Sequence, residues 1–178
     1  MNTSSIRKLV TAALFAALAC MATLVIQLHI SPSGGFVNLG DCVVLICGWV
    51  LSPVYGMAAA GIGSMMADVI AGYPIYAPAT LVIKALMTLA AGGLFRFLTV
   101  KLQRSQIAAC ILSAVLGEAI MAAGYCFYEF VILGLGPAAL LGLPGSGVQA
   151  FCGGVSAVVV YLLLRRNKTL SDHLDQLQ

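Results

Sequence analysis

Long apolar runs, separated by short segments rich in glycine, proline or polar residues, follow one another along the whole chain. About 20 apolar residues are needed for an α-helix to cross the hydrocarbon core of a bilayer, so most of these runs are typical of transmembrane helices. The separating segments are SPSGG, SP, GYP, KLQRSQ and GPAALLGLPG. The pattern predicts six helices, at residues 7–30, 41–52, 55–72, 78–100, 107–135 and 147–164.

The second run is short, because its twelve residues would span only about 18 Å. The basic residues indicate that it still counts as a crossing. They gather in three groups, Arg7–Lys8, Arg96–Arg104 and Arg165–Lys168, and the positive-inside rule favours the cytoplasm for all three. The loops without Lys or Arg are residues 31–40, 72–77 and 134–145. We therefore predict an all-α bundle of six transmembrane helices with both termini in the cytoplasm.

The composition agrees with a membrane protein. Of the 178 residues, 61% are hydrophobic and 8% are charged, whereas a soluble domain carries about a quarter charged residues. The mean hydropathy is +1.05. A water-soluble enzyme is excluded, and six spans with short loops fill the length. Residues 1–178 are therefore expected to form a single transmembrane domain.

Sequence signatures of common catalytic sites are absent from the chain. It contains no P-loop, HExxH, GxSxG or GxGxxG motif. None of the six cysteines forms a CxxC pair, and most lie within apolar runs, as small core residues do. We expect no enzyme activity, no cofactor or metal, and no nucleic-acid partner.

Five charged residues lie away from the basic groups and the polar C-terminal tail: Asp41, Asp68, Lys84, Glu118 and Glu129. Each would cost about 2.5 to 3.5 kcal/mol at the centre of a transmembrane helix, so each is expected to face the bundle interior, a cavity or the interface. Asp41 and Asp68 are predicted to be structural carboxylates that form ion pairs. Lys84 either pairs with Asp68 or contacts a substrate directly.

Polar residues also recur along one face of the fifth and sixth helices. Offsets of four, seven and eleven residues return to one helix face, and this relation joins Glu118 to Tyr125 and Glu129. Ser146 and Gln149 begin a similar face on the sixth helix. These groups either bond neighbouring helices or line a pocket.

Aromatic residues and tight turns gather at the ends of the helices predicted to face outward. Tyr73 and Tyr76 lie in GYPIYAP, where they either form an interfacial belt or line a pocket. A small polar ring compound could stack on a tyrosine there and bond to Asn38, Lys84 or Gln149. We therefore predict a pocket that opens outward.

Small residues recur every fourth position in the first helix, at Ala12, Ala16 and Cys20. Such a face allows another helix to approach closely. The partner is either a helix of the same bundle or a separate membrane subunit.

The segment from Asn38 to Gly92 resembles the substrate-binding S components of energy-coupling-factor (ECF) vitamin transporters. The resemblance covers roughly residues 12–154 and extends to GEAIMAAGYCFYE and LPGSGVQAFCGG in the fifth and sixth helices. The segments that carry it are Gly40–Asp41, Ser52–Gly56, Gly61–Asp68, Gly72–Thr80 and Ile83–Lys84.

The resemblance implies a subunit that captures a small water-soluble vitamin outside the plasma membrane of a prokaryote. A membrane scaffold subunit and two ATPases would then drive its uptake. By the same resemblance, Ala12 and Ala16 would dock on the scaffold. The implied pocket residues are Asn38, Tyr73, Tyr76, Lys84, Tyr125, Glu129, Ser146 and Gln149, with Ser146 in the place of a usual Asn. Hydroxymethylpyrimidine or another thiamin-related compound is the first expected substrate, followed by pyridoxine or riboflavin.

An alternative function is a stand-alone ion-coupled carrier that uses Glu118 or Glu129 as its titrating group. The two halves of the chain show no internal repeat, although many such carriers contain one. An intramembrane enzyme is the weakest alternative, because no nucleophile lies near a plausible base.

Overall fold

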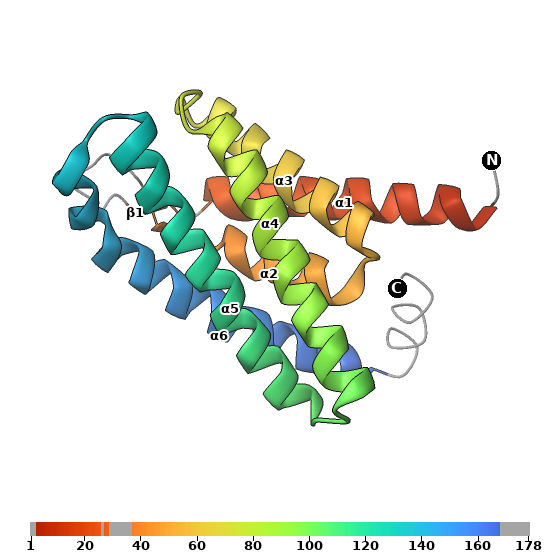
Figure 1. Ribbon diagram of the computed structural model, residues 1–178. Helices are drawn as coiled ribbons and strands as arrows, with labels where there is room; N and C mark the ends of the chain where they lie inside the picture. The colour runs from red at the N-terminus through yellow and green to blue at the C-terminus, as the bar shows by residue number, and fades with distance from the viewer. Residues whose placement is uncertain (1–2, 26, 29–36, 168–178) are drawn as a thin grey trace.

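The computed structural model describes residues 3–25, 27–28 and 37–167, which form a helical bundle (Figure 1). In this part of the chain the α-helices are α1 (Thr3–Val25), α2 (Gly40–Val50), α3 (Pro53–Ile70), α4 (Ala77–Arg96), α5 (Gln106–Phe127) and α6 (Leu143–Arg166). Five helical segments within the described residues are long and apolar enough to cross a membrane, and α2 is a shorter apolar helix. The predicted all-α membrane bundle of six helices is confirmed.

Shorter elements join and extend these helices. β1 (Gln27–Leu28) pairs antiparallel with β2 (Val37–Asn38) in the connection between α1 and α2. A π-helical turn, Phe97–Lys101, extends α4, and a second, Tyr128–Ile132, extends α5. A 3-10 helix, Gly136–Gly142, leads into α6.

The connection between α5 and α6 differs from the sequence expectation. Residues 134–145 were expected to be a loop, yet the 3-10 helix occupies much of this range and α6 begins at Leu143. Pro137 and Pro144 each lie in a first helical turn, where proline lacks only an N–H that would have no helical partner. Proline therefore starts these helices instead of separating them.

The short helix α2 lies inside the bundle and packs against each of the other five α-helices of the described chain. Nine of its eleven residues are buried. Its length is roughly 16 Å at the usual helical rise, too short for a lipid-exposed span. Because surrounding helices cover it, its backbone ends are not exposed to hydrocarbon, and a short helix is tolerated there.

Aromatic packing holds the C-terminal half of α2 in place. The Trp49 ring makes an edge contact with Tyr161, with centroids 5.3 Å apart, and lies 6.0 Å from Phe95. The Trp49 indole N–H donates to the Ser113 hydroxyl oxygen at 2.9 Å. Arg96 donates to the carbonyl oxygens of Gly48 in α2 and of Leu51, which directly follows the helix. A cation is favoured at this negative end of the helix dipole.

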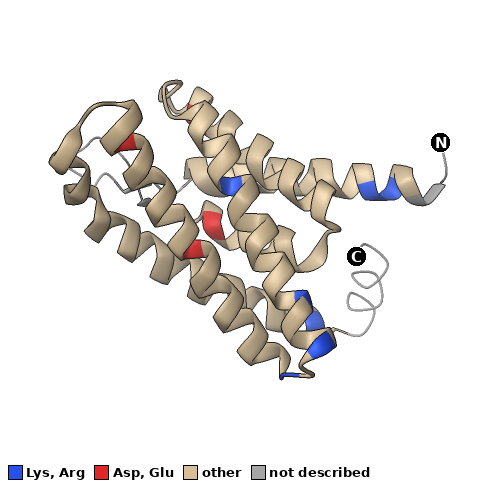
Figure 2. Ribbon diagram, in the orientation of Figure 1, with Lys and Arg blue, Asp and Glu red and all other residues tan. Residues whose placement is uncertain are grey.

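The charges separate along the bundle, as Figure 2 shows. Arg96 ends α4, Lys101 ends the π-helical turn after it, and Arg165 and Arg166 end α6. The turn between α3 and α4 and the connection between α5 and α6 lie toward the other end of these helices (Figure 1). The two ends of the bundle therefore differ in charge.

The small-residue face of α1 packs against α3 within the chain. Ala12 is 6% exposed, and a Cβ atom added at Gly63 of α3 would collide with the Ala16 carbonyl oxygen. Ala12 and the Ala16 backbone are thus used within the bundle, whereas Ala16 remains partly exposed, and docking of a partner subunit through this face stays a prediction. The close helix approach that small residues permit is used inside the bundle.

Helices α2 and α4 also approach closely, at a pair of glycines. A Cβ atom at Gly92 would collide with the Gly48 carbonyl oxygen, and one at Gly48 would lie 2.8 Å from the Thr88 carbonyl oxygen. Backbone atoms cannot rotate away from such a clash. The absence of side chains at Gly48 and Gly92 is therefore needed for this packing.

We predict that Gly92→Val destabilises the protein by about 1–3 kcal/mol, because the two helix backbones must move apart. Gly93→Val is the matched control, since a Cβ atom at Gly93 meets nothing within 4 Å. Both changes carry the same difference in helix propensity. Thermal unfolding in detergent measures the effect, and equal melting temperatures of the two variants would contradict the prediction.

Candidate functional site

A cavity of about 90 Å³, here called the tyrosine cavity, lies where β2, the α3–α4 turn and the α5–α6 connection meet. Seven of the eight predicted pocket residues line it, and Lys84 does not. These seven are Asn38, Tyr73, Tyr76, Tyr125, Glu129, Ser146 and Gln149. The structure thus brings together residues that are more than 100 positions apart in the sequence.

Tyr76 and Glu129 form one wall of the tyrosine cavity. The Tyr76 hydroxyl donates to Glu129 Oε1 at 3.2 Å, and the Tyr76 ring centroid lies 5.8 Å from that of Tyr128. Tyr76 directly precedes α4, whose first turn contains Pro78, so the start of the helix sets the position of the ring. Burial, and after it the neighbouring Glu129, raises the pKa of Tyr76 to about 12.

Thr80 is a cavity residue that the sequence analysis missed. Its hydroxyl and that of Tyr125 are hydrogen-bonded at 2.9 Å, and Thr80 is buried. Thr80 precedes Lys84 by four residues and therefore shares its helix face, a signal that could have identified it. Met121 was missed as well, although it lies four residues before Tyr125 on α5.

Lys84 lies behind the cavity and pairs with Asp41 of α2. Both side chains are buried, and the Lys84 ammonium also lies 5.6 Å from the centroid of the Tyr125 ring. The predicted pair of Lys84 with Asp68 is therefore wrong. Asp68 lies near the end of α3 in the cavity wall, whereas Asp41 begins the buried helix that packs beside α4.

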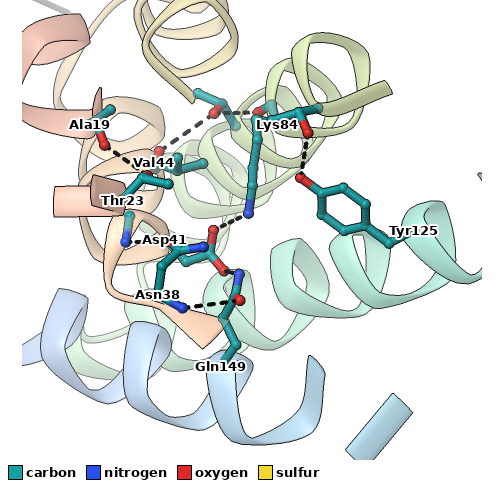
Figure 3. A network of polar contacts seen from close by, with 11 residues as sticks. Ala19, Thr23, Asn38, Asp41, Val44, Lys84, Tyr125 and Gln149 are labelled. Atoms are coloured by element: carbon teal, nitrogen blue, oxygen red, sulfur yellow. Dashed lines mark hydrogen bonds and ion pairs between the residues drawn. The ribbon is translucent and has the colours of Figure 1, made fainter. Parts of the chain in front are cut away.

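A chain of hydrogen bonds joins the ion pair to the cavity wall (Figure 3). Gln149 Nε2 donates to Asp41 Oδ2 at 2.6 Å, and the Asn38 backbone N–H donates to Gln149 Oε1 at 3.3 Å. Asn38 Oδ1 in turn accepts from the Gly40 backbone N–H at 2.8 Å. Two residues of the cavity lining are thereby connected to a carboxylate that does not line it.

Two other carboxyl groups in the described structure keep oxygens without a hydrogen-bond partner. They are Glu118, with both oxygens, and Asp68, with Oδ2. Asp68 lines the tyrosine cavity. Glu118 instead lines a mostly apolar groove of about 560 Å³ between α5 and α6, which shares only Leu143 and Ser146 with the lining of the tyrosine cavity.

The family model of the ECF-type riboflavin transporter S component matches residues 3–166. The chain belongs to this family. S components are the substrate-binding subunits of ECF transporters, so this S component is a multi-pass membrane protein of that class.

Two individual proteins similar to this S component illustrate the relationship. A Pyrococcus woesei protein described as "Uncharacterized protein in gap 3'region" is 33% identical over 118 residues, which cover 66% of this chain and 75% of the relative. A solved structure described as the S component of a bacterial ECF transporter has a TM-score of 0.65 and 20% identity, over 96% of this chain and 98% of that chain. At this identity the second likeness supports the fold.

We predict that Lys84→Met destabilises the S component by about 3–5 kcal/mol, because it leaves the Asp41 carboxylate buried without its counter-ion. The double variant Asp41→Leu/Lys84→Met should recover much of this loss, since it buries no charge at either position. Thermal unfolding of both variants in detergent tests the prediction. A single variant that melts like the wild type but loses its ligand would instead favour direct contact of Lys84 with substrate.

The raised pKa of Tyr76 predicts that its hydroxyl remains a neutral donor well above pH 10, where an ordinary tyrosine ionises. Because burial and Glu129 disfavour the phenolate, its ionisation should occur near pH 12. The difference in phenolate absorbance between the wild type and Tyr76→Phe, followed against pH, isolates this one group. A difference step near pH 10 would refute the prediction.

Proposed function

We propose that this chain is the substrate-capture subunit of an ATP-driven ECF importer that binds a small heteroaromatic vitamin or vitamin precursor. The observation that carries the proposal is the tyrosine cavity, in which three tyrosines and several amide, hydroxyl and carboxyl groups surround one space. Apolar walls with a few converging polar groups are characteristic of small-molecule sites.

The proposed orientation follows from the charges. Arg96, Lys101 and Arg165 lie at the ends of helical segments away from the tyrosine cavity. The positive-inside rule favours the cytoplasm for these residues, with both termini on the same side. The cavity then faces the outside of a prokaryotic plasma membrane, where a vitamin would be captured.

The lining of the cavity favours a substrate with hydrogen-bond donors. It contains the carboxyl groups of Asp68 and Glu129 but no lysine or arginine among the described residues. An amine or a hydroxymethyl group would complement these acceptors, and an aromatic ring would stack on a tyrosine. Hydroxymethylpyrimidine and related thiamin precursors have both features, and pyridoxine has a ring with hydroxymethyl groups.

Riboflavin is the second candidate substrate, because the description of the matching family model names it. Its three fused rings could also stack on the tyrosines. The cavity of about 90 Å³ is small beside the roughly 300–1,000 Å³ of typical ligand pockets, which supports the single-ring compounds first.

Partner subunits would supply the energy for uptake. The sequence contains no P-loop, so we propose that two ATPases act through a membrane scaffold subunit that receives this chain. The ion-coupled alternative relies on Glu118 or Glu129. Vesicles that contain this chain alone separate the two functions, since uptake driven by a proton or sodium gradient would support the carrier.

Mass spectrometry of small molecules released from the purified, detergent-solubilised chain tests the proposed function directly. We expect a heteroaromatic vitamin or precursor at near-equimolar amount. Titrations with hydroxymethylpyrimidine, thiamin, pyridoxine and riboflavin then rank the candidates. Failure of all four to bind, with no released compound, would overturn the proposed function.

We predict that Tyr76→Ala weakens binding of the identified compound about tenfold or more, because it removes an aromatic wall and the donor to Glu129. Phe151→Ala is the control. Phe151 is 73% exposed on α6 and does not line the tyrosine cavity. Equal affinities of the two variants, measured by titration calorimetry, would contradict this placement of the site.

A further inference from the structure

Asp41 occupies an unusual position relative to the tyrosine cavity. It is completely buried and does not line the cavity, yet its carboxylate accepts from two long polar side chains. Oδ1 accepts from the Lys84 ammonium and Oδ2 from the Gln149 amide. Both oxygens are thus committed to groups that approach from different helices, α4 and α6.

The contact with Asp41 determines which way the Gln149 amide faces. A carboxylate can only accept, so it takes the NH2 end of the amide and turns Oε1 toward the Asn38 backbone N–H. The 2.6 Å donor–acceptor distance is that of a short, charge-assisted hydrogen bond. One amide hydrogen and one lone pair of Gln149 then remain for the cavity that this residue lines.

Lys84 contributes to the orientation of Gln149 through its ion pair with Asp41. An ammonium can only donate, so its pairing with Oδ1 leaves Oδ2 as the acceptor that orients Gln149. The same ammonium lies over the Tyr125 ring, whose hydroxyl is bonded to Thr80, another residue of the lining. The ion pair therefore contacts two residues of the cavity lining, Gln149 and Tyr125, and Figure 3 shows Lys84 reaching Asp41 beside Tyr125.

From this geometry we propose that Asp41 is a positioning residue for substrate selection. By fixing the Gln149 amide, it sets the pattern of donors and acceptors that this wall presents to a bound ring, and Lys84 maintains that setting. The inference rests on the proposed function, since it takes the tyrosine cavity as the substrate site. It adds a means by which the cavity would distinguish ring compounds of equal size.

A purely structural role for Asp41 would be to fill and pair a buried polar position, and Glu118 provides the control for a change at such a position. A Cβ atom added at Gly153 would lie 2.7 Å from Asp41 Cβ and 3.1 Å from Glu118 Oε1, so both carboxyl side chains flank the same glycine. Glu118 makes no hydrogen bond to the cavity lining and does not line it. Glu118→Gln therefore replaces a neighbouring buried carboxyl group and leaves the hydrogen bonds of Asp41 and Gln149 in place.

The test uses Asp41→Asn in the full-length chain, with Asp41→Glu as the conservative variant. Asparagine can turn its NH2 group toward Gln149, whose amide then reverses. The probes are 4-amino-5-hydroxymethyl-2-methylpyrimidine and its 4-oxo counterpart, in which an acceptor replaces the amino donor. We expect Asp41→Asn to change the ratio of the two affinities about tenfold, the effect of one gained or lost hydrogen bond. Asp41→Glu and Glu118→Gln should keep the wild-type ratio.

A second measurement does not depend on any ligand. The side-chain amide resonances of Gln149, assigned with Gln149→Ala, should be shifted by the bond to the carboxylate in the wild type, in Asp41→Glu and in Glu118→Gln. The shift should disappear in Asp41→Asn. An unchanged affinity ratio in Asp41→Asn, or unchanged Gln149 resonances, would overturn the inference. If the wild type binds neither pyrimidine, the pyrimidine candidates fail, while the amide spectrum still decides the role of Asp41.

Discussion

The ion pair between Asp41 of α2 and Lys84 of α4 is the interaction on which the polar interior of this bundle depends. An isolated charge in a membrane-embedded core is expensive, so each partner makes the other acceptable. Once paired, the carboxylate has a second oxygen free to hold Gln149, and the ammonium lies against Tyr125. The pair thus makes two buried charges tolerable, and it also contacts Gln149 and Tyr125, which line the tyrosine cavity.

The pair can form because α2 lies deep inside the bundle. Gly48 and Gly92 allow the backbones of α2 and α4 to approach closely, and Trp49 anchors the C-terminal half of α2 against Phe95 and Tyr161. These contacts hold Asp41, at the start of the same helix, opposite Lys84. The packing of the C-terminal half of α2 therefore fixes the position of the ion pair at its N-terminal end, close to the tyrosine cavity.

Membership of the S-component family and the geometry of the cavity are both consistent with a substrate-binding protein. As an S component the chain is the substrate-binding subunit, and the tyrosine cavity is the site that we propose for a small ring compound. The small-residue face of α1 packs in part against α3. Much of α1 remains exposed, including Leu14 and Leu18.

The fold class followed from sequence alone, because about 20 apolar residues per run and few charges leave no alternative to membrane helices. Most of the cavity residues were also predictable, since a polar side chain within such a run must face the protein interior. Sequence could not decide that Lys84 pairs with Asp41 instead of Asp68, or that the Ala16 backbone lies against Gly63 of α3. Those outcomes depend on which helices are neighbours and how deeply α2 is buried. Helix periodicity specifies the face on which a side chain lies, but only the packed bundle specifies what that face meets.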